Sequence, residues 1–327
     1  VIKEYGVDIL RYSLFNGISI NMDSRFSEKK VELSRNFLNK VWNASKYVLM
    51  QLEGNEVKDI SEVKLNLADK WIITQTNKLI DSVNRKFDKY DIGMAESELG
   101  DFFWTKFCDY YIELSKTDMA GDNAEASRAT LNYVLTILLK LLHPFIPFIT
   151  EKIYLELPKH DESIMISAWP EKTQDYETES NEMEEIIKII GSIRNARNEK
   201  KVPDNKKIVI KIFPTKNKQL FKVASGYIKK LCLASDVLTI SSEEPSQGAI
   251  NLTFNDCKVI LPLESMVDMG EEKARREKEI ESVKFEIARS EGMLSNPKFV
   301  EKAPAALVEQ ERQKLEKNKQ LLQELQK

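Results

Sequence analysis

The segment Asp23–Gln51, DSRFSEKKVELSRNFLNKVWNASKYVLMQ, constrains the fold more than any other stretch of the chain. Its apolar residues recur at spacings of three and four, the repeat of one helix face. A helix this long with one apolar side needs other helices to cover that side, so the segment predicts a helical bundle. The expected core-facing residues are Leu33, Phe37, Val41, Ala44 and Val48, with Leu38, Trp42 and Leu49 widening the same arc.

The opposite face of this helix is polar. Lysines and asparagines can donate hydrogen bonds to phosphates and base edges, and a tyrosine ring can stack on an unpaired base. A solvated helix face has the same composition, so the pattern alone only suggests a nucleic-acid surface. The residues on this face are Lys29, Asn36, Lys40, Asn43 and Tyr47, with Arg35, Asn39 and Lys46 beside them.

Length and composition set limits on the rest. A chain of 327 residues has room for two or more domains. Its formal net charge is only −3, so a nucleic-acid surface has to be a local basic patch. Cys108, Cys232 and Cys257 form no CxxC pair, which favours a reducing compartment and argues against structural zinc. No signal peptide or bilayer-spanning run is apparent, and the start at Val1 within a helical pattern suggests a piece of a longer protein.

The remaining sequence predicts a mainly α protein with three kinds of structure. Residues 31–170 form a helical bundle after a junction segment at 1–30. Residues 171–205 hold an acidic linker, Glu171–Glu182, and a helix with a basic end, Met183–Lys200. Further bundle helices are expected within Val1–Gly17, from Asp69 to Phe87, from Gly93 to Leu114, at Ala124–Leu142 and at Phe145–Leu157.

The hydrophobic pattern changes in the last two regions of the chain. Residues 206–265 are expected to form a small α/β domain, and residues 266–327 carry two heptad seams joined by the turn SNPKFVEKAP. Two seams joined by one turn predict an antiparallel coiled-coil hairpin. The expected elements are strands at Ile208–Phe213, Val237–Ile240, Ala249–Phe254 and Lys258–Leu263, a helix at Leu220–Leu233, and seams Ile280, Val283, Ile287, Leu294 and Val308, Leu315, Leu322, Leu325.

The sequence offers no catalytic or metal-binding constellation. It has no phosphate-binding glycine loop, no metal-ligand cluster and no nucleophile paired with a base. His143, between an apolar helix and a proline, is interpreted as a capping or core residue. Asp109 and Glu113 lie one helical turn apart and could suggest paired carboxylates, but such a pair more often faces an arginine or water.

Several motifs together resemble the C-terminal half of bacterial valyl-tRNA synthetase, a class Ia aminoacyl-tRNA synthetase. The resemblance covers nearly the whole chain. IRNARNEKKVP and LSNPKFVEKAP favour the valine enzyme over its relatives. The isoleucine enzyme usually ends in a cysteine-rich zinc module, which the three scattered cysteines of this chain cannot build. The other matching segments are KEYGVDILRYSLF, DSRFSEKKVELSRNFLNKVWNASKYV, FFWTKFCDYYIELSK, LLKLLHPFIPFITEKIY and SAWP.

The resemblance implies an anticodon-binding helical bundle followed by a tRNA-binding coiled-coil arm. It places the anticodon-contacting surface at Arg25, Lys29, Lys40, Tyr47, Ile112 and Glu113, and the contacts to the tRNA elbow at Arg289 and Lys314. The family can carry arginine at the position of Lys29 and phenylalanine at that of Tyr47. Because lysine lacks the bidentate fork of arginine, Lys29 is expected to contact phosphate rather than read a base.

The same resemblance implies that the HIGH-type and KMSKS-type motifs lie on a catalytic domain that this chain lacks, along with the editing domain. The full-length valine–tRNA ligase would use ATP and Mg²⁺, whereas this chain would bind no cofactor and be inactive alone. Its implied partner is tRNA(Val), with no membrane contact, in a monomeric cytoplasmic protein. The alternative from another class is a helical scaffold that recruits proteins through its coiled coil.

Overall fold

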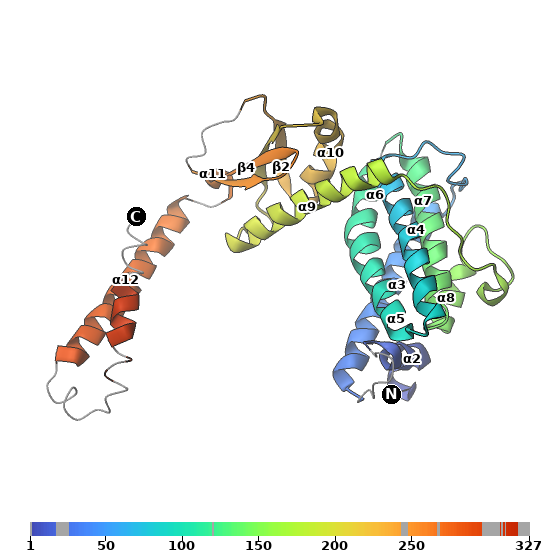
Figure 1. Cartoon of the computed structure of the whole chain (residues 1–327), viewed down its shortest axis with the longest axis horizontal. Coiled ribbons are helices and arrows are strands. Elements are labelled where there is room, and N and C mark those ends of the chain that lie inside the picture. The colour runs from blue at the N-terminus through green and yellow to red at the C-terminus, as the bar shows by residue number, and fades with distance from the viewer. Residues whose placement is uncertain are drawn as a thin grey trace.

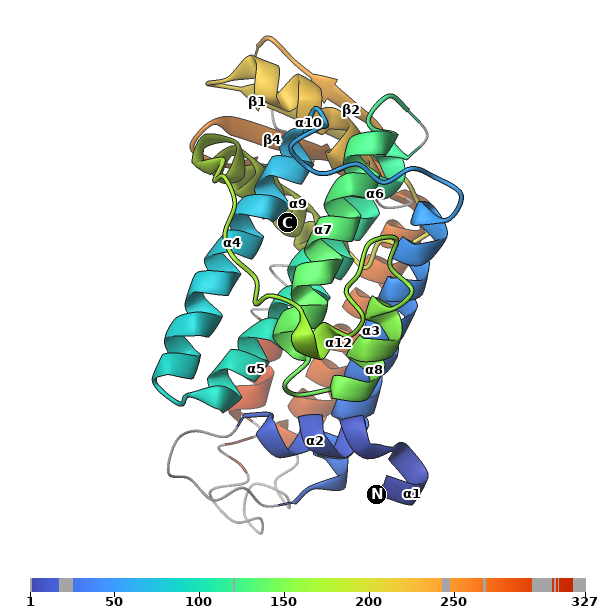
Figure 2. The same cartoon turned by 90° about the vertical axis from the view of Figure 1, so that its right-hand side faces the viewer.

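The computed structural model describes residues 2–17, 26–119, 121–242, 248–266, 269–295, 308, 310 and 312–319. Its N-terminal half is a bundle of roughly parallel and antiparallel helices, as the sequence predicts (Figures 1 and 2). The bundle helices are α1 (Ile2–Tyr5), α2 (Val7–Phe15), α3 (Glu28–Leu52), α4 (Leu67–Asp88), α5 (Ile92–Asp101), η1 (Phe102–Ile112), α6 (Glu113–Asp118), α7 (Ala124–Leu142) and α8 (Pro147–Tyr154), followed by the short turn η2 (Ile164–Ile166).

The predicted apolar face of α3 is buried along its centre but not at its edges. Phe37, Val41 and Val48 are buried as expected. Leu33 and Trp42 were expected in the core, and that prediction is wrong, because their side chains are 57% and 45% exposed. The helices packed on α3, chiefly α2, α7 and η1, cover an arc narrower than its apolar stripe.

Two predicted helices are interrupted. The N-terminal one divides into α1 and α2 at Gly6, whose φ of 92° lies in the region that glycine tolerates best. The one predicted between Gly93 and Leu114 is helical throughout, but its centre, η1, is a π-helix of 11 residues. π-Helical turns are rare and are frequent at functional sites, so η1 marks this part of the bundle for closer inspection.

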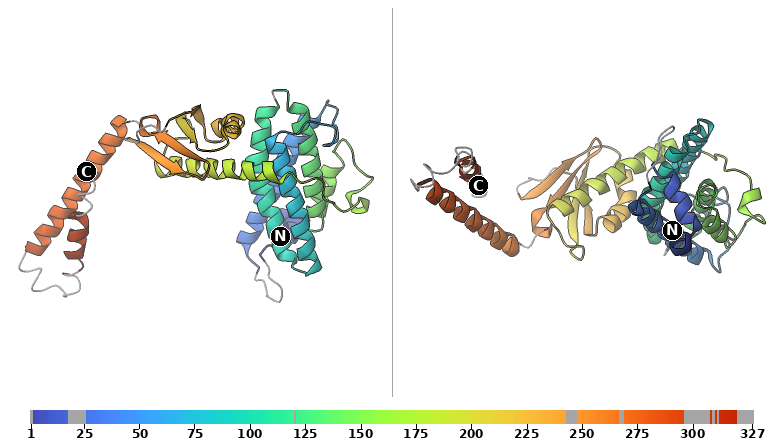
Figure 3. Two further views of the ribbon diagram at one scale, coloured as in Figure 1. Left: turned by 45° about the horizontal axis from the view of Figure 1, so that its top comes forward. Right: turned by 90° about the horizontal axis from the view of Figure 1, so that it is seen from below.

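The acidic segment before the basic helix is not a linker in its second half. Helix α9 (Glu177–Glu199) begins six residues before the expected Met183, and its first turns pack along α4. Lys70 Nζ pairs with Glu179 at 2.6 Å, and Trp71 Nε1 donates to Glu184 at 2.9 Å. These contacts join the start of α9 to the bundle, and the helix then extends away from it (Figure 3).

The small α/β domain forms as predicted around one mixed sheet. The strand order is β2-β1-β4-β3, with β1 and β2 parallel and the other pairs antiparallel. Helix α10 makes the crossover between the parallel strands and packs against both α9 and α6. The elements are β1 (Ile208–Pro214), α10 (Lys218–Leu231), β2 (Ala234–Thr239), β3 (Ala249–Thr253), β4 (Cys257–Pro262) and α11 (Leu263–Met266).

The C-terminal arm consists of the long helix α12 (Met269–Ser295) and a second helical stretch at 312–319 beside it (Figure 1). Val308 is buried, and the seam residues Ile280, Val283 and Ile287 are half-buried. Leu322 and Leu325, expected on the second seam, lie outside the described residues. In both Figures 1 and 3 the arm and the bundle stand at opposite ends of the molecule.

Candidate nucleic-acid interface

Lys40 lies where α3 meets the π-helix η1. Its Nζ pairs with Asp109 Oδ1 at 3.1 Å and lies 4.9 Å from the centre of the Trp104 ring. The indole is 39% exposed, so one part of the ring remains open to solvent. A half-exposed lysine fixed beside an open aromatic ring can contact a phosphate while the ring offers a surface for stacking.

Tyr47, two helical turns further along α3, forms a second cluster with α6. The Nζ of Lys116 lies 5.3 Å from the centre of the Tyr47 ring and 2.5 Å from Glu113 Oε1. Burial raises the pKa of the Tyr47 hydroxyl above its usual value, so the phenol stays neutral at physiological pH. The cluster therefore combines a ring, a cation and a carboxylate that can accept from a base amino group.

We call these two clusters together the α3–η1 strip: Lys40, Tyr47, Trp104, Asp109, Glu113 and Lys116. Lys40 and Tyr47 were expected opposite the apolar face, but both are half-buried, so the polar row borders that face instead. This position brings them against η1 and α6. Lys40 thus lies beside η1, and Tyr47 and Glu113 both lie beside Lys116 of α6.

The other three expected anticodon residues are placed differently. Lys29 is exposed at the far end of α3, about 27 Å along the helix axis from Tyr47. Ile112 is only 6% exposed and packs in the core, so little of its side chain is available for contact with a ligand. Arg25 lies outside the described residues.

Sequence reasoning missed several members of the strip as interface residues. Asp109 was considered only with Glu113, as a possible carboxylate pair, and each of the two instead pairs with a lysine. Glu113 itself was expected at the interface from the resemblance. Trp104 and Lys116 were not singled out, because an aromatic run such as FFWTKFCDYY predicts core. The π-helix on which Trp104 lies likewise has no recognisable signature in a single sequence.

The two arm residues expected at the tRNA elbow meet at one carboxylate. Lys314 Nζ pairs with Glu286 Oε2 at 2.6 Å, and Arg289 Nη1 lies 3.7 Å from Glu286 Oε1. The hydrogen bond from Lys314 lowers the pKa of Glu286, so this carboxylate is ionised at neutral pH. Both cationic side chains are about half exposed, at 60% for Arg289 and 48% for Lys314. The arm therefore presents two neighbouring cations with one anion between them.

The interpretation of His143 as a structural residue is consistent with its contacts. Its Nδ1 lies 2.8 Å from Thr150 Oγ1, and burial lowers the pKa of the imidazole. Within the described ranges, no three His, Cys, Asp or Glu side chains are grouped so that they could hold a metal ion. No helix in that part of the chain is long and apolar enough to cross a membrane.

Comparison with known proteins identifies two segments. Residues 69–212 match the family model of the anticodon-binding domain of tRNA ligases, and residues 268–327 match that of the valyl tRNA synthetase tRNA binding arm. The first match begins with α4, so it contains Ile112 and Glu113 but not Lys40 or Tyr47. The second contains both Arg289 and Lys314.

Curated relatives match along nearly the whole chain. The valine–tRNA ligase of Clostridium acetobutylicum is 41% identical over 99% of this chain and 38% of its own length. That of Listeria monocytogenes is 40% identical over 96% of this chain and 36% of its own length. The chain therefore spans less than two fifths of the length of these relatives.

Among solved structures, the ternary complex of Agrobacterium radiobacter K84 LeuRS-tRNA-LeuAMS matches with a TM-score of 0.43 and 19% identity, over 55% of this chain and 21% of that one. The anticodon-binding model matches most of the bundle and α9, and the tRNA-binding-arm model matches the C-terminal arm. The chain therefore corresponds to the C-terminal region of the bacterial valyl-tRNA synthetase family.

Proposed function

We propose that this chain is the tRNA-binding part of a valine–tRNA ligase, contacting the anticodon through its bundle and the tRNA elbow through its arm. The observation that carries this proposal is the α3–η1 strip. In it Lys40 lies beside the exposed ring of Trp104, and Tyr47 and Glu113 both lie beside Lys116.

The chemistry of the strip fits the anticodons of valine tRNAs, which the resemblance gives as sharing adenine and cytosine at the second and third positions. Lys40 and Lys116 can donate to adenine ring nitrogens or to phosphates. Glu113 can accept from the exocyclic amino group of cytosine. Tyr47 and Trp104 supply flat faces for unstacked bases. Arg25 and Lys29 would extend the contact toward the start of α3.

The arm supplies the second proposed contact. Arg289 and Lys314 would lie against the outer corner of the tRNA, where the D and T loops meet. Their long aliphatic stems can pack on a flat exposed base pair while the charged ends reach phosphates. This role rests on the match of residues 268–327 to the tRNA-binding arm family.

We further propose that the chain has no ligase activity alone and needs no cofactor, while the complete enzyme uses ATP and Mg²⁺. The proposal rests on the absence of HIGH-like and KMSKS-like motifs from the sequence. A cytoplasmic location and a monomeric state are proposed on the resemblance. Valine-dependent ATP–pyrophosphate exchange by the purified chain would contradict the proposed inactivity, and analytical ultracentrifugation would determine the oligomeric state.

A gel shift tests the tRNA contact directly. The chain is titrated into tRNA(Val) and into the same tRNA with its second and third anticodon bases exchanged. We expect tighter binding to the natural anticodon, with affinity falling as salt rises, because phosphate contacts release counterions. Equal affinity for the two tRNAs would remove the anticodon role. No binding to either would contradict the proposal as a whole.

A further inference from the structure

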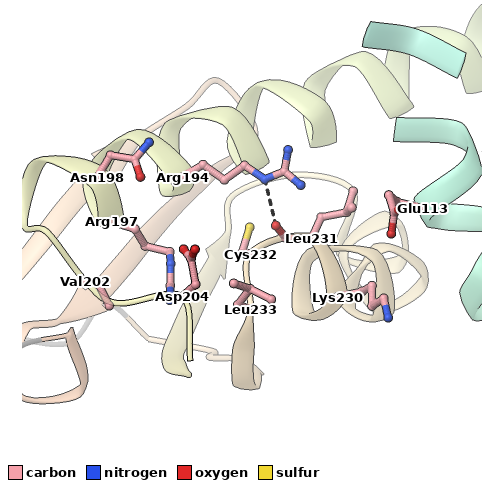
Figure 4. Close-up of a pocket in the computed structure, with 10 residues that line it drawn as sticks. All are labelled: Glu113, Arg194, Arg197, Asn198, Val202, Asp204, Lys230, Leu231, Cys232 and Leu233. Carbon is pink, nitrogen blue, oxygen red and sulfur yellow. Dashed lines mark hydrogen bonds between the residues drawn. The ribbon is translucent and has the colours of Figure 1, made fainter. Parts of the chain in front are cut away.

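A pocket lies where the bundle, α9 and the small α/β domain meet. Its volume is about 500 Å³, and we call it the junction pocket. Figure 4 shows arginines reaching into it from one face of α9, with the end of α10 below them and α6 at one side. The lining residues are Glu113, Arg194, Arg197, Asn198, Val202, Asp204, Lys230, Leu231, Cys232 and Leu233.

Arg197 is a buried cation with an unused hydrogen-bond donor. Its side chain is 5% exposed, and Nη2 donates to the carbonyls of Pro203 at 3.1 Å and Lys206 at 2.9 Å. Its Nη1 is buried and has no hydrogen-bond partner among the described residues. Leaving such a donor unpaired is costly, so a small shift of the Arg197 side chain toward an acceptor in the pocket would be stabilised.

The rest of the lining shows which kind of acceptor fits. Arg194 is fixed by its Nε bond to the Leu231 carbonyl at 2.8 Å, and Lys230 is exposed at the rim, so both can approach a phosphate. Glu113 lies on the same side as Lys230 but is already paired with Lys116, whereas Asp204 lies at the other end beside Arg197 (Figure 4). A ligand with its negative charge toward Lys230 and hydrogen-bond donors toward Asp204 therefore fits the lining.

The pocket also has an apolar wall. Leu233 is 43% exposed and has a φ of 52°, a backbone conformation that leucine rarely adopts. With Val202 it offers a surface on which a flat ring can pack. A phosphate, a ring with polar edges and an apolar face are the parts of one nucleotide.

We propose that the junction pocket receives a single unstacked nucleotide of the same RNA loop that lies on the α3–η1 strip. This inference rests on the proposed function, and Glu113 connects the two sites, because it belongs to the strip and also lines the pocket. The phosphate lies toward Arg194 and Lys230. The base edge faces Arg197 and Asp204, with its ring on Leu233.

The test uses the full chain and a hairpin RNA with the anticodon stem and loop of tRNA(Val). Lys230→Ala should weaken hairpin binding roughly three- to tenfold, because it removes one bond to a phosphate. Lys229→Ala is the matched control: this neighbour on α10 is also exposed but does not line the pocket, so we expect a change of less than about twofold. Leu233→Gly removes the apolar wall at a backbone conformation that suits glycine, so it should weaken binding without loss of thermal stability.

An abasic scan of the loop identifies the nucleotide. Each loop base is removed in turn, and binding is measured with wild type and with Leu233→Gly. We expect one position where base removal weakens wild-type binding but no longer affects the variant, since coupled partners are not additive. If Lys230→Ala and Leu233→Gly both bind the hairpin as tightly as wild type and keep its anticodon preference, the pocket proposal is overturned and the proposed function stands. If wild type does not bind the hairpin at all, both proposals are overturned. Micromolar binding of a nucleoside 5′-monophosphate that leaves hairpin binding unchanged would assign the pocket to a free nucleotide instead.

Discussion

At the scale of single residues, the ring of Tyr47 separates a binding surface from an ordinary solvated helix face. Tyr47→Ala should reduce affinity for the anticodon hairpin by about 1–3 kcal/mol, the usual contribution of one base stacked on an aromatic ring. Tyr47→Phe should keep wild-type affinity, because stacking needs the ring and not the hydroxyl. Trp42→Ala is the control, since this indole is a 45% exposed aromatic on α3 that lies off the strip. Fluorescence anisotropy of labelled hairpin measures all three, and unchanged binding by Tyr47→Ala would leave the ring with only a packing role.

Glu96 links residue chemistry to stability rather than to binding. The side chain is fully buried beside Tyr12, so its carboxylate is largely removed from water. Burial raises the pKa of Glu96 from 4.5 to about 7. The folded state therefore holds the proton more tightly than the unfolded chain, and the free energy of unfolding falls as pH rises between these two values.

Glu96→Gln should remove this loss. At pH 8 we expect the variant to be more stable than wild type by on the order of 3 kcal/mol, with little difference at pH 4.5. Urea denaturation at the two pH values measures the effect, and Glu32→Gln, an exposed change on α3, serves as the control. The buried Asp69, whose pKa burial raises to about 6, should leave part of the pH dependence in place. A variant that is equally stable or less stable than wild type at pH 8 would contradict the account.

At the scale of elements, the sequence predicted the helices and strands well because their apolar periodicity is long. The expected helix at Ala124–Leu142 agrees with α7 at both ends, since a proline two residues later stops it. The apolar periodicity of one helix does not show which other helices pack against it. It could not show that Leu33 and Trp42 would stay exposed, or that α4 would bind the acidic start of α9 through ion pairs.

The interface residues likewise fall into those that the sequence could group and those that it could not. Helical spacing grouped Lys40 with Tyr47, because both lie on one regular helix. It could not bring Trp104 or Lys116 to them, because these residues lie on η1 and α6, and their place beside α3 depends on how the helices pack. The junction pocket was likewise beyond sequence reasoning, because elements far apart in the chain form it.

The arm offers a prediction about charge between neighbouring helices. Glu286 holds Lys314 and Arg289 together and partly neutralises them. Glu286→Gln should therefore tighten binding to tRNA(Val), and the plot of log affinity against log salt should steepen by up to about one unit for each further phosphate that the freed cations neutralise. Glu291→Gln is the matched control, because Glu291 pairs with Lys319, which is not expected to touch the RNA. Weaker binding by Glu286→Gln would mean that the carboxylate positions the two cations instead of masking them.

At the scale of the whole molecule, the two proposed RNA-binding surfaces stand far apart with α9 between them. The start of α9 is joined to α4 by ion pairs, and the helix also packs on the small domain through α10 (Figure 3). The bundle and the arm therefore present separate surfaces, and a tRNA that touches both would bind through two linked sites. In such binding the second site raises affinity through effective concentration, without changing the selectivity of the first.

Deletion of residues 269–327 tests this arrangement. We expect affinity for tRNA(Val) to fall at least about tenfold, because the second linked site is removed, and the salt dependence to become shallower. The ratio of affinities for natural and exchanged anticodons should stay as in the full chain, since the α3–η1 strip is intact. The small anticodon hairpin, which has no elbow, should bind both proteins equally and so serves as the internal control. Circular dichroism should show that the bundle remains folded, because its core is built from α2 to α9 without the arm. If the deletion instead abolished anticodon discrimination while the bundle stayed folded, the arm would be needed for the structure of the anticodon site. The two binding surfaces would then not be independent of each other.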